Sequence, residues 1–491
     1  MNAPIRRLSV LVAAMFGLLL IFGSWVQFAD AKSLRDAEGN SRTLLSSYEQ
    51  ERGAILVDQT QVARSEKAPS GESVKYVRNY PQGPLYGHLT GWFSLSYGAG
   101  GLELAENELL SGSSDALFYR RLGDLLTGKR PTGVNLDLTI DARTQQAADK
   151  ALGNRRGAIV ALDPKTGAIL AMVSHPQYDP NAISTVDATA AQKAWKSYSA
   201  DGAKPMVNRA IAGDLYPAGS TFKVVLAAAA LRAGRTENSR LTGVARLPIP
   251  QTSHTLPNDW NGPCGGGTVT LTEALAMSCN TAFAQLGLDL GAQSIKDEAA
   301  RFGFGKELEV PLKVTPSATG PMDNPPKVAY TSIGQQDVQV TPLQMAMVAA
   351  GVANGGSVMR PYLVKQTRGS GLDVVDTAKP TELSRALSPD QASALTRMMV
   401  QVTESGQGTG RAARIPGMQV AAKSGTAEHG QDAAGNPLAP HAWFISFAPA
   451  DDPKVAVAVL VENGGLSAPG PGASFDAAPL AQEVMKAVMN R

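Results

Sequence analysis

The sequence predicts an α+β fold in which one mostly antiparallel sheet takes strands from both ends of a C-terminal domain and is covered by helices. Three observations support this prediction: two apolar runs around a turn near residue 165, three more apolar runs beyond residue 418, and a long stretch between them that is rich in helix formers. At 491 residues the chain exceeds one ordinary domain, so we expect further segments before this one.

The first two strands are expected from a hairpin pattern. Residues 157–162 and 168–173 are apolar, and Asp163-Pro-Lys-Thr-Gly167 between them has the composition of a turn. Upstream, Asp141 stands where a helix N-cap is expected, directly after a strand-like end. This change of pattern indicates a boundary, and we assign residues 156–491 to the C-terminal domain.

The other elements of this domain follow from apolar runs and helix-stop signals. The run at 222–233 is rich in helix formers and ends at Gly234, a residue type that favours the end of a helix. The remaining expected elements are helices at 271–277 and 281–288, strands at 419–427, 442–447 and 455–461, and a final helix at 480–489.

The N-terminus carries an apolar run long enough to cross a membrane. Two arginines within residues 1–7 precede an apolar run of 19 residues that ends at Val26. We expect a retained plasma-membrane anchor at 8–28, with residues 1–7 as a cytoplasmic tail. A cleaved signal peptide is the alternative, since Ala29-Asp-Ala31 has the spacing of a cleavage site. Both interpretations place the rest of the chain outside the cytoplasm.

Residues 31–155 mix short strand-like pieces, such as 53–57 and 74–77, with many glycine, serine and polar residues. We find no catalytic set of residues in this stretch. We therefore expect a pedestal or dimerisation-like module between the anchor and the C-terminal domain.

Composition and charge argue against several classes of function. The formal net charge is only +2 and the basic residues are dispersed, so nothing resembles a nucleic-acid-binding surface. No two of the five histidines stand at metal-ligand spacing, and no H-E-x-x-H occurs. We expect no nucleic-acid partner, no metal ion and no cofactor.

The two cysteines are candidates for a disulfide bond. Thiols outside the cytoplasm tend to oxidise, and Cys264 and Cys279 stand 15 positions apart. A bridge would close a short loop. It would stabilise the fold by roughly 3 kcal/mol, because it lowers the conformational entropy of the unfolded chain. Two free thiols remain the alternative, because sequence alone does not place the two Cα atoms.

Three short motifs occur in a fixed order: Ser220-Thr-Phe-Lys223, Ser278-Cys-Asn280 and Lys423-Ser-Gly425. Each is weak alone, because serine and asparagine also cap helices, and K-[S/T]-G occurs a second time at Lys165-Thr-Gly167. That second copy lies in the predicted hairpin turn, so we assign it to structure. The ordered set, whose third motif continues to Thr426 on a predicted strand, is far more specific.

The first motif has a direct chemical meaning. Residues three apart on a helix share a face, so Ser220 and Lys223 are expected to meet at the start of a helix. A neutral lysine can serve as the base that makes a serine hydroxyl nucleophilic. The unpaired N–H groups and positive dipole of that helix end would stabilise an oxyanion. Pro217-Ala-Gly219 supplies a tight turn just before it.

With these motifs, residues 155–491 resemble the transpeptidase domain of penicillin-binding proteins. The single anchor and a pedestal of about 125 residues resemble the monofunctional class B group. The total length and segments 427–430 and 441–443 resemble the actinobacterial penicillin-binding protein A group in particular. Other matching stretches are 162–172, 178–181, 208–209, 302–305, 332–335 and 341–342.

The resemblance implies an acyl-transfer mechanism. Ser220 would attack the penultimate D-Ala carbonyl of a peptidoglycan stem peptide and release the terminal D-Ala, while Lys223 accepts the serine proton. Ser278 would relay a proton to the leaving amine, with Lys423 tuning it electrostatically. An amine from a neighbouring stem peptide would then resolve the acyl-enzyme.

The resemblance also implies a substrate-binding set, namely Asn280, Lys423, Ser424, Gly425 and Thr426. Asn280 would bond to the substrate amide, and Ser424 and Thr426 would hold its carboxylate. The backbone N–H groups of Ser220 and Thr426 would form the oxyanion hole. Ser424 replaces the threonine of many relatives and keeps the hydroxyl.

The implied ligands are D-Ala-D-Ala stem peptides and β-lactam antibiotics, and the implied partners are a membrane-embedded glycosyltransferase and other cell-envelope or divisome proteins. A D,D-carboxypeptidase or a β-lactamase uses the same motifs, although the anchor and pedestal disfavour both. A β-lactam sensor or a non-catalytic divisome scaffold is the alternative from another class. The short cytoplasmic tail disfavours the sensor, and the complete motif set disfavours the scaffold.

A β-lactamase would also need a carboxylate that activates water. The nearest candidate after the second motif is Glu309, in Glu309-Val-Pro-Leu-Lys313, which matches the expected E-x-x-L-N pattern only partly. We therefore expect a stable penicilloyl adduct, with Lys223 as the acylation base.

Overall fold

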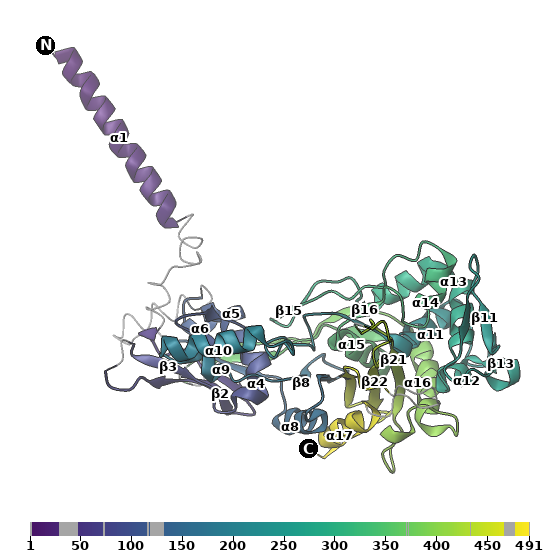
Figure 1. The fold of residues 1–491 in the computed structure, drawn as a ribbon. Coiled ribbons are helices and arrows are strands. Elements are labelled where there is room, and N and C mark those ends of the chain that lie inside the picture. Colours follow the sequence, from purple (N-terminus) through teal and green to yellow (C-terminus); the bar gives the residue numbers. More distant parts are fainter. Residues whose placement is uncertain are drawn as a thin grey trace.

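The structure is a computed structural model, and its fold is that of an elongated body preceded by one long helix (Figure 1). The alternative cleavage site at 29–31 and the first residues of the expected pedestal lie outside the described residues. The structure describes residues 2–28, 48–71, 74–114, 117, 132–369, 371, 373–432, 434–465 and 477–490.

A five-stranded antiparallel sheet, in the order β21-β22-β23-β7-β8, forms the centre of the C-terminal domain. The predicted hairpin consists of β7 (Gly157–Leu162) and β8 (Ile169–His175). β23 (Val455–Val461) pairs with β7 and so joins the two ends of the domain. β22 (His441–Ala448) and β21 (Ala421–Ala427) complete the sheet, which confirms the predicted α+β architecture.

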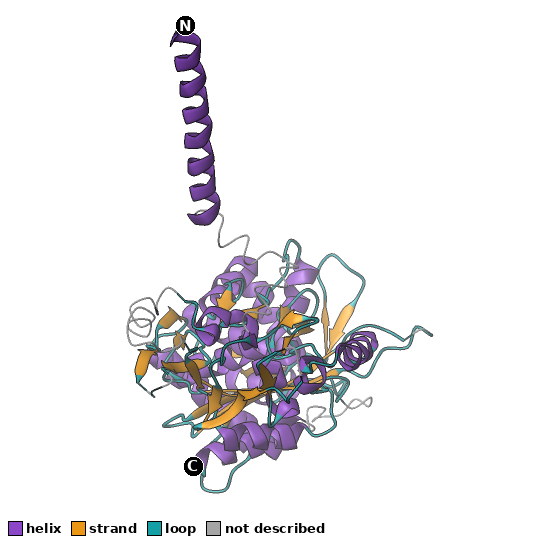
Figure 2. Cartoon of the chain, turned by 90° about the vertical axis from the view of Figure 1, so that its left-hand side faces the viewer, coloured by secondary structure: helices purple, strands orange, loops and turns teal. Residues whose placement is uncertain are grey.

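Both faces of this sheet are buried, because successive side chains of a strand point to opposite faces and enter two different cores. On β23, Val457 and Val459 belong to a core shared with α17 (Ala477–Met489) and α8 (Ala142–Leu152). Ala458 belongs to the other core, against α15 (Pro342–Ala353). The strands accordingly run between layers of helices in Figure 2.

The helices between the two strand groups position the first two sequence motifs. α11 (Lys223–Arg232) ends before Gly234 at a positive φ of 85°, as its sequence predicts. α12 (Leu271–Ala276) begins at a capping box, and α13 (Asn280–Arg301) follows after a short connection. The helix predicted at 281–288 matches the first half of α13. A break at Gly291, whose φ is 77°, separates it from a second half in which Ile295 is buried.

Among its described residues, the domain also contains two further α-helices and five pairs of short strands. They are α14 (Pro325–Thr331), α16 (Pro389–Glu404), β9 (Tyr216–Pro217) with β16 (Gln339–Val340), β10 (Arg240–Thr242) with β13 (Thr268–Thr270), β11 (Arg246–Pro248) with β12 (Thr255–Pro257), β14 (Leu308–Glu309) with β15 (Lys313–Val314), and β17 (Ser357–Met359) with β20 (Glu382–Arg385).

A second, six-stranded sheet lies in the N-terminal part, and its strands come from two distant stretches of the chain. In spatial order these are β19 (Val374–Thr377), β18 (Val364–Arg368), β6 (Asn135–Leu138), β1 (Ile55–Val57), β2 (Thr60–Lys67) and β3 (Tyr76–Asn79). β18 and β19 belong to the range assigned to the C-terminal domain, yet β18 pairs with β6. The sequence boundary near residue 156 therefore does not separate the two parts in space.

Helices complete this N-terminal part. Two of them, α9 (Pro180–Ser184) and α10 (Ala188–Ala200), also come from beyond residue 156 and lie beside the N-terminal helices in Figure 1. The other helices among the described residues are α4 (Gly83–Thr90), α5 (Leu102–Ala105) and α6 (Asn107–Ser111), and a short strand pair is formed by β4 (Phe93–Ser94) and β5 (Gly98–Ala99).

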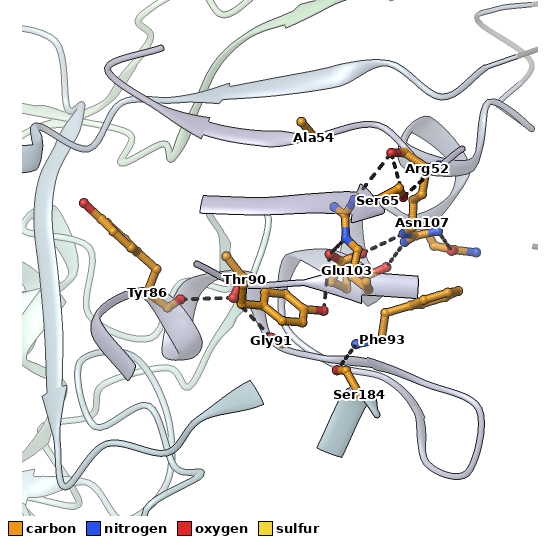
Figure 3. Close-up of polar contacts among 12 residues, drawn as sticks. Arg52, Ala54, Ser65, Tyr86, Thr90, Gly91, Phe93, Glu103, Asn107 and Ser184 are labelled. Carbon is orange, nitrogen blue, oxygen red and sulfur yellow. Dashed lines mark hydrogen bonds and ion pairs between the residues drawn. The ribbon is translucent and has the colours of Figure 1, made fainter. Parts of the chain in front are cut away.

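A buried ion cluster centred on Glu103 links α5 to β3, which carries Arg78, and to the segment before β1, which carries Arg52. Arg52 and Arg78 each donate from Nε to one Glu103 carboxylate oxygen over 2.6 Å, and Arg52 also donates to Asn107 over 2.8 Å (Figure 3). Burial works to raise the pKa of Glu103, but the two guanidinium groups hold it below its usual range. Removing Glu103 would leave two buried guanidinium groups without their carboxylate, a loss of about 3–5 kcal/mol of stability.

The first helix, α1 (Asn2–Phe28), matches the predicted anchor. Its segment Ala3–Val26 is long and apolar enough to cross a membrane. The helix begins at Asn2, so most of the predicted tail, residues 1–7, continues the same helix.

Candidate active site

Ser220 opens a buried helix at the wall of a cleft. It lies in the 3-10 turn Gly219–Phe222, which leads directly into α11, and 9% of its surface is exposed. Gly219 has a positive φ of 53°, and a Cβ atom there would lie 2.4 Å from the carbonyl oxygen of Thr426. Glycine therefore allows the backbone before Ser220 to approach β21 closely.

Lys223 lies one helical turn after Ser220 and is fully buried. Its Nζ donates to Ser220 Oγ over 3.0 Å and to Asn280 Oδ1 over 2.6 Å. Burial lowers the pKa of Lys223 to about 7, and the negative charge of Asp259 acts in the opposite direction. A lysine with this pKa is partly neutral near neutral pH and can accept a proton from a bound hydroxyl.

Ser278 stands on the short connection between α12 and α13, and Asn280 is the first residue of α13. Ser278 has a positive φ of 62°, a conformation that costs a non-glycine residue on the order of 1–2 kcal/mol. Its carbonyl oxygen accepts from Lys223 Nζ over 2.8 Å, and its hydroxyl lies 3.3 Å from the same nitrogen. Cys279, between the two motif residues, forms a disulfide bond with Cys264 over a Cα–Cα distance of 6.2 Å.

Lys423 and Ser424 lie on β21, the edge strand of the five-stranded sheet. Lys423 is fully buried and its Nζ donates to the carbonyl oxygen of Ser424 over 2.8 Å. Burial, together with the positive charge of Lys223, holds the pKa of Lys423 well below its usual range. The Ser424 hydroxyl is also buried and lies 2.6 Å from the hydroxyl of Thr409.

Gly425 and Thr426 bring the same strand against the Ser220 turn. A Cβ atom at Gly425 would lie 2.9 Å from Thr221 Cγ2, so this glycine lets the turn and the strand pack closely. Thr426 lines the cleft together with Ser220 and Asn280. The third motif and the Ser220 turn therefore pack against each other at the wall of the cleft.

The cleft has a volume of about 1070 Å³. Its lining includes two carboxylates, Asp259 and Glu428, and the imidazole of His429. Lys223, Ser278, Lys423 and Ser424 are buried behind this lining.

The structure brings the predicted residues together to different degrees. Ser220, Lys223, Ser278 and Asn280 form one hydrogen-bonded cluster, although 55 positions separate Lys223 from Ser278. Lys423 interacts with this cluster through its charge: burial and the positive charge of Lys223 both lower the pKa of Lys423.

Two residues of the site were missed in the sequence. Asp259 accepts a hydrogen bond from Asn280 Nδ2 over 2.7 Å, and Thr409 contacts Ser424. Each stands well before its partner, by 21 and 15 positions respectively, and neither belongs to a recognised motif. The glycine-rich composition of residues 406–410 was the available signal for Thr409, and Asp259 had none of comparable strength.

Two sequence features lie away from the site. The second K-T-G copy, Lys165-Thr-Gly167, occupies the turn between β7 and β8, where Lys165 pairs with Asp452 at the surface. Glu309 lies on β14 in a two-stranded hairpin, and it is absent from the described residues that line the cleft.

Family models match two segments of the chain. The penicillin-binding protein transpeptidase domain matches residues 157–490, and the penicillin-binding protein A dimerisation domain matches residues 52–136.

Relatives match over the full length. The peptidoglycan D,D-transpeptidase PbpA of Mycolicibacterium smegmatis is 45% identical over 100% of this chain and 99% of its own. Its namesake from Mycobacterium tuberculosis is 44% identical over the same shares.

Solved structures of penicillin-binding protein A from M. tuberculosis match as well. A crystal structure has a TM-score of 0.85 and 43% identity over 90% of this chain and 100% of that one. A penicillin G acyl-enzyme complex has a TM-score of 0.84 and 43% identity over the same shares. The chain therefore belongs to the penicillin-binding protein transpeptidase family and carries the dimerisation domain of penicillin-binding protein A before its catalytic domain.

Proposed function

We propose that this protein is a peptidoglycan D,D-transpeptidase that cross-links stem peptides through an acyl-enzyme on Ser220. One observation carries the proposal: a buried lysine with a pKa of about 7 donates to the Ser220 hydroxyl over 3.0 Å at the wall of an open cleft. The family membership and the name shared by the mycobacterial relatives support it.

In the acylation step, neutral Lys223 removes the proton of Ser220 as its Oγ attacks the penultimate D-Ala carbonyl carbon. The new C–O bond gives a tetrahedral oxyanion beside the start of α11, where helix N–H groups are unpaired. The C–N bond to the terminal D-Ala then breaks. Its nitrogen takes the proton held by Lys223 through the hydroxyl of Ser278, which lies 3.3 Å from Lys223 Nζ.

Substrate binding uses the two sides of the cleft. Asn280 bonds to the substrate amide, and Ser424, Gly425 and Thr426 present β21 to the terminal carboxylate. Lys423 adds a favourable electrostatic influence when it is protonated. The N–H groups of Ser220 and Thr426 form the oxyanion hole, an arrangement consistent with the close approach of Gly219 to Thr426.

The second half-reaction returns the enzyme to its starting state. An amine of a neighbouring stem peptide attacks the acyl carbon, gives its proton to Lys223, and expels Ser220, which regains a proton. A β-lactam acylates the same serine but leaves an adduct that resists this step. The absence of Glu309 from the described cleft lining is consistent with slow attack by water.

We also propose the cellular arrangement. α1 anchors the chain in the plasma membrane with its N-terminus in the cytoplasm, which follows from its length and its flanking arginines. The catalytic domain then lies outside the membrane beside the growing wall, where a membrane-embedded glycosyltransferase and divisome proteins supply and organise the glycan strands.

A turnover assay tests the proposed function. The full-length protein is incubated with a D-Ala-D-Ala peptide or its thioester mimic, with and without an acceptor amine. A transpeptidase releases D-Ala and joins donor to acceptor, whereas a D,D-carboxypeptidase gives only the hydrolysed donor. A β-lactam sensor or an inactive scaffold releases nothing, and that result would overturn the proposal.

A further inference from the structure

Asp259 closes a chain of hydrogen bonds that ends at the nucleophile. Its Oδ1 accepts from Asn280 Nδ2 over 2.7 Å, Asn280 Oδ1 accepts from Lys223 Nζ over 2.6 Å, and Lys223 reaches Ser220 Oγ over 3.0 Å. Asp259 also lines the cleft. Asp259 is therefore connected to Lys223 and Ser220 through the side chain of Asn280.

The amide of Asn280 has two orientations of nearly the same shape, and its partners decide between them. A carboxylate only accepts, so Asp259 requires the amide nitrogen on its side. The amide oxygen then faces Lys223. In the reverse orientation the amide nitrogen would donate to the lone pair of neutral Lys223 and occupy the electron pair that must take the serine proton.

The segment that carries Asp259 is held in place from both sides. The buried side chain of Asn258 accepts from the backbone N–H of Thr281 over 3.0 Å and donates to the carbonyl of Gly262 over 2.9 Å. The disulfide between Cys264 and Cys279 ties the end of the segment to the residue before Asn280. Asp259 and Asn280 are thus fixed to the same helix start.

The negative charge of Asp259 also acts on the two buried lysines of the site. Lys423 from β21 and Asp259 from the segment after β12 are the charged groups around Lys223, with the ring of Phe283 from α13 nearby at 5.7 Å. Burial lowers the pKa of both lysines, and Asp259 opposes this effect on each.

We propose that Asp259 is a positioning residue, whose carboxylate holds the Asn280 amide oxygen toward Lys223 and leaves the second amide N–H free for the substrate. That second N–H has only a long contact of 3.5 Å with the carbonyl of Pro257. The inference rests on the proposed roles of Ser220 and Lys223 and adds the residue that orients their shared partner.

Two substitutions separate orientation from charge. Asp259→Asn keeps an oxygen that can accept from Asn280 but removes the charge, whereas Asp259→Ala removes both. Glu309→Gln, outside the described cleft lining, is the matched control for loss of one carboxylate. The measurement is the second-order rate constant for acylation of the full-length protein by a fluorescent penicillin between pH 5 and pH 9, together with the melting temperature.

Removing the charge lowers the pKa of Lys223 further, so the rise of the rate with pH moves to lower pH in both Asp259 variants. Above this rise the acylation rate reaches a plateau. The plateau rate falls about tenfold in Asp259→Ala, which corresponds to the loss of one hydrogen bond, and stays within about threefold of the wild type in Asp259→Asn. An unchanged plateau in Asp259→Ala, or equal losses in both variants without a shift of the pH profile, would overturn the inference.

The same assay keeps this inference apart from the proposed function. Ser220→Ala, measured in parallel, tests whether Ser220 is the acylated residue at all. Labelling that persists in Ser220→Ala contradicts the proposed function, whereas failure confined to the Asp259 variants contradicts only the positioning role.

Discussion

Lys223 and Ser278, 55 positions apart in the chain, are joined by two contacts: Lys223 Nζ lies 2.8 Å from the carbonyl oxygen of Ser278 and 3.3 Å from its hydroxyl. The carbonyl contact depends on the left-handed backbone of Ser278, whose φ is 62°. One buried nitrogen thereby connects the start of α11 with the start of α13. The following predictions test what this arrangement does.

Ser220→Ala is expected to abolish covalent labelling by penicillin while leaving the fold intact. The side chain is small and partly exposed at the cleft, so its hydroxyl matters for chemistry and little for packing. Intact-protein mass spectrometry measures the adduct, and circular dichroism checks the fold. A penicilloyl mass in the variant would contradict the assignment of the nucleophile.

The acylation rate is expected to rise with pH through about 7 and then level off. Burial lowers the pKa of Lys223 to about 7, so the neutral, proton-accepting form becomes dominant above that pH. Lys223→Ala should lower the plateau by about 10²–10⁴-fold, the usual contribution of a general base. Stopped-flow acylation from pH 5.5 to pH 9 measures both effects. A wild-type rate independent of pH over this range would contradict the role of Lys223.

Loss of the disulfide is expected to lower both stability and acylation rate. The double variant Cys264→Ser, Cys279→Ser avoids a stray thiol, and it should lose roughly 3 kcal/mol of unfolding free energy. The acylation rate falls because the bond links the Asp259 segment to the residue between Ser278 and Asn280. Thiol titration of the unfolded, unreduced wild type should detect no reactive thiol, and two thiols would contradict the premise.

Removal of residues 1–30 is expected to give a soluble protein that still reacts with penicillin. The cut falls after α1, which ends at Phe28, and every motif of the site lies beyond residue 200. Size-exclusion chromatography without detergent and fluorescent-penicillin labelling are the measurements. A truncated protein that is folded yet fails to acylate would reveal a role of the N-terminal segment in the site.

Penicillin is expected to form a durable adduct. A β-lactamase clears its acyl-serine with water that a placed carboxylate activates, and Glu309, the candidate for that role in the sequence, is absent from the described residues lining the cleft. Glu309→Gln should therefore leave acylation and adduct lifetime unchanged. Mass spectrometry over hours follows the adduct. Rapid multiple turnover of a chromogenic cephalosporin by the wild type would favour a β-lactamase instead.

The sequence by itself determined the features whose signals lie within a few neighbouring residues. The helix that starts at Asp141, the hairpin around Gly167 and the helix end at Gly234 follow from capping and turn chemistry, which act over three to five positions. The expected meeting of Ser220 and Lys223 has the same local origin, because their spacing is one helical turn.

Only the tertiary structure decided the features that depend on distant segments. The partnership of Asp259 with Asn280, the depth at which Lys223 is buried and the pairing of β18 with β6 join stretches that no local pattern connects. The second helical segment of α13, after the break at Gly291, was not predicted, and its Ile295 is buried by residues elsewhere in the chain. Burial sets the pKa of Lys223, and burial is a property of the packed fold, so the sequence predicted the base whereas only the fold lowers its pKa to about 7.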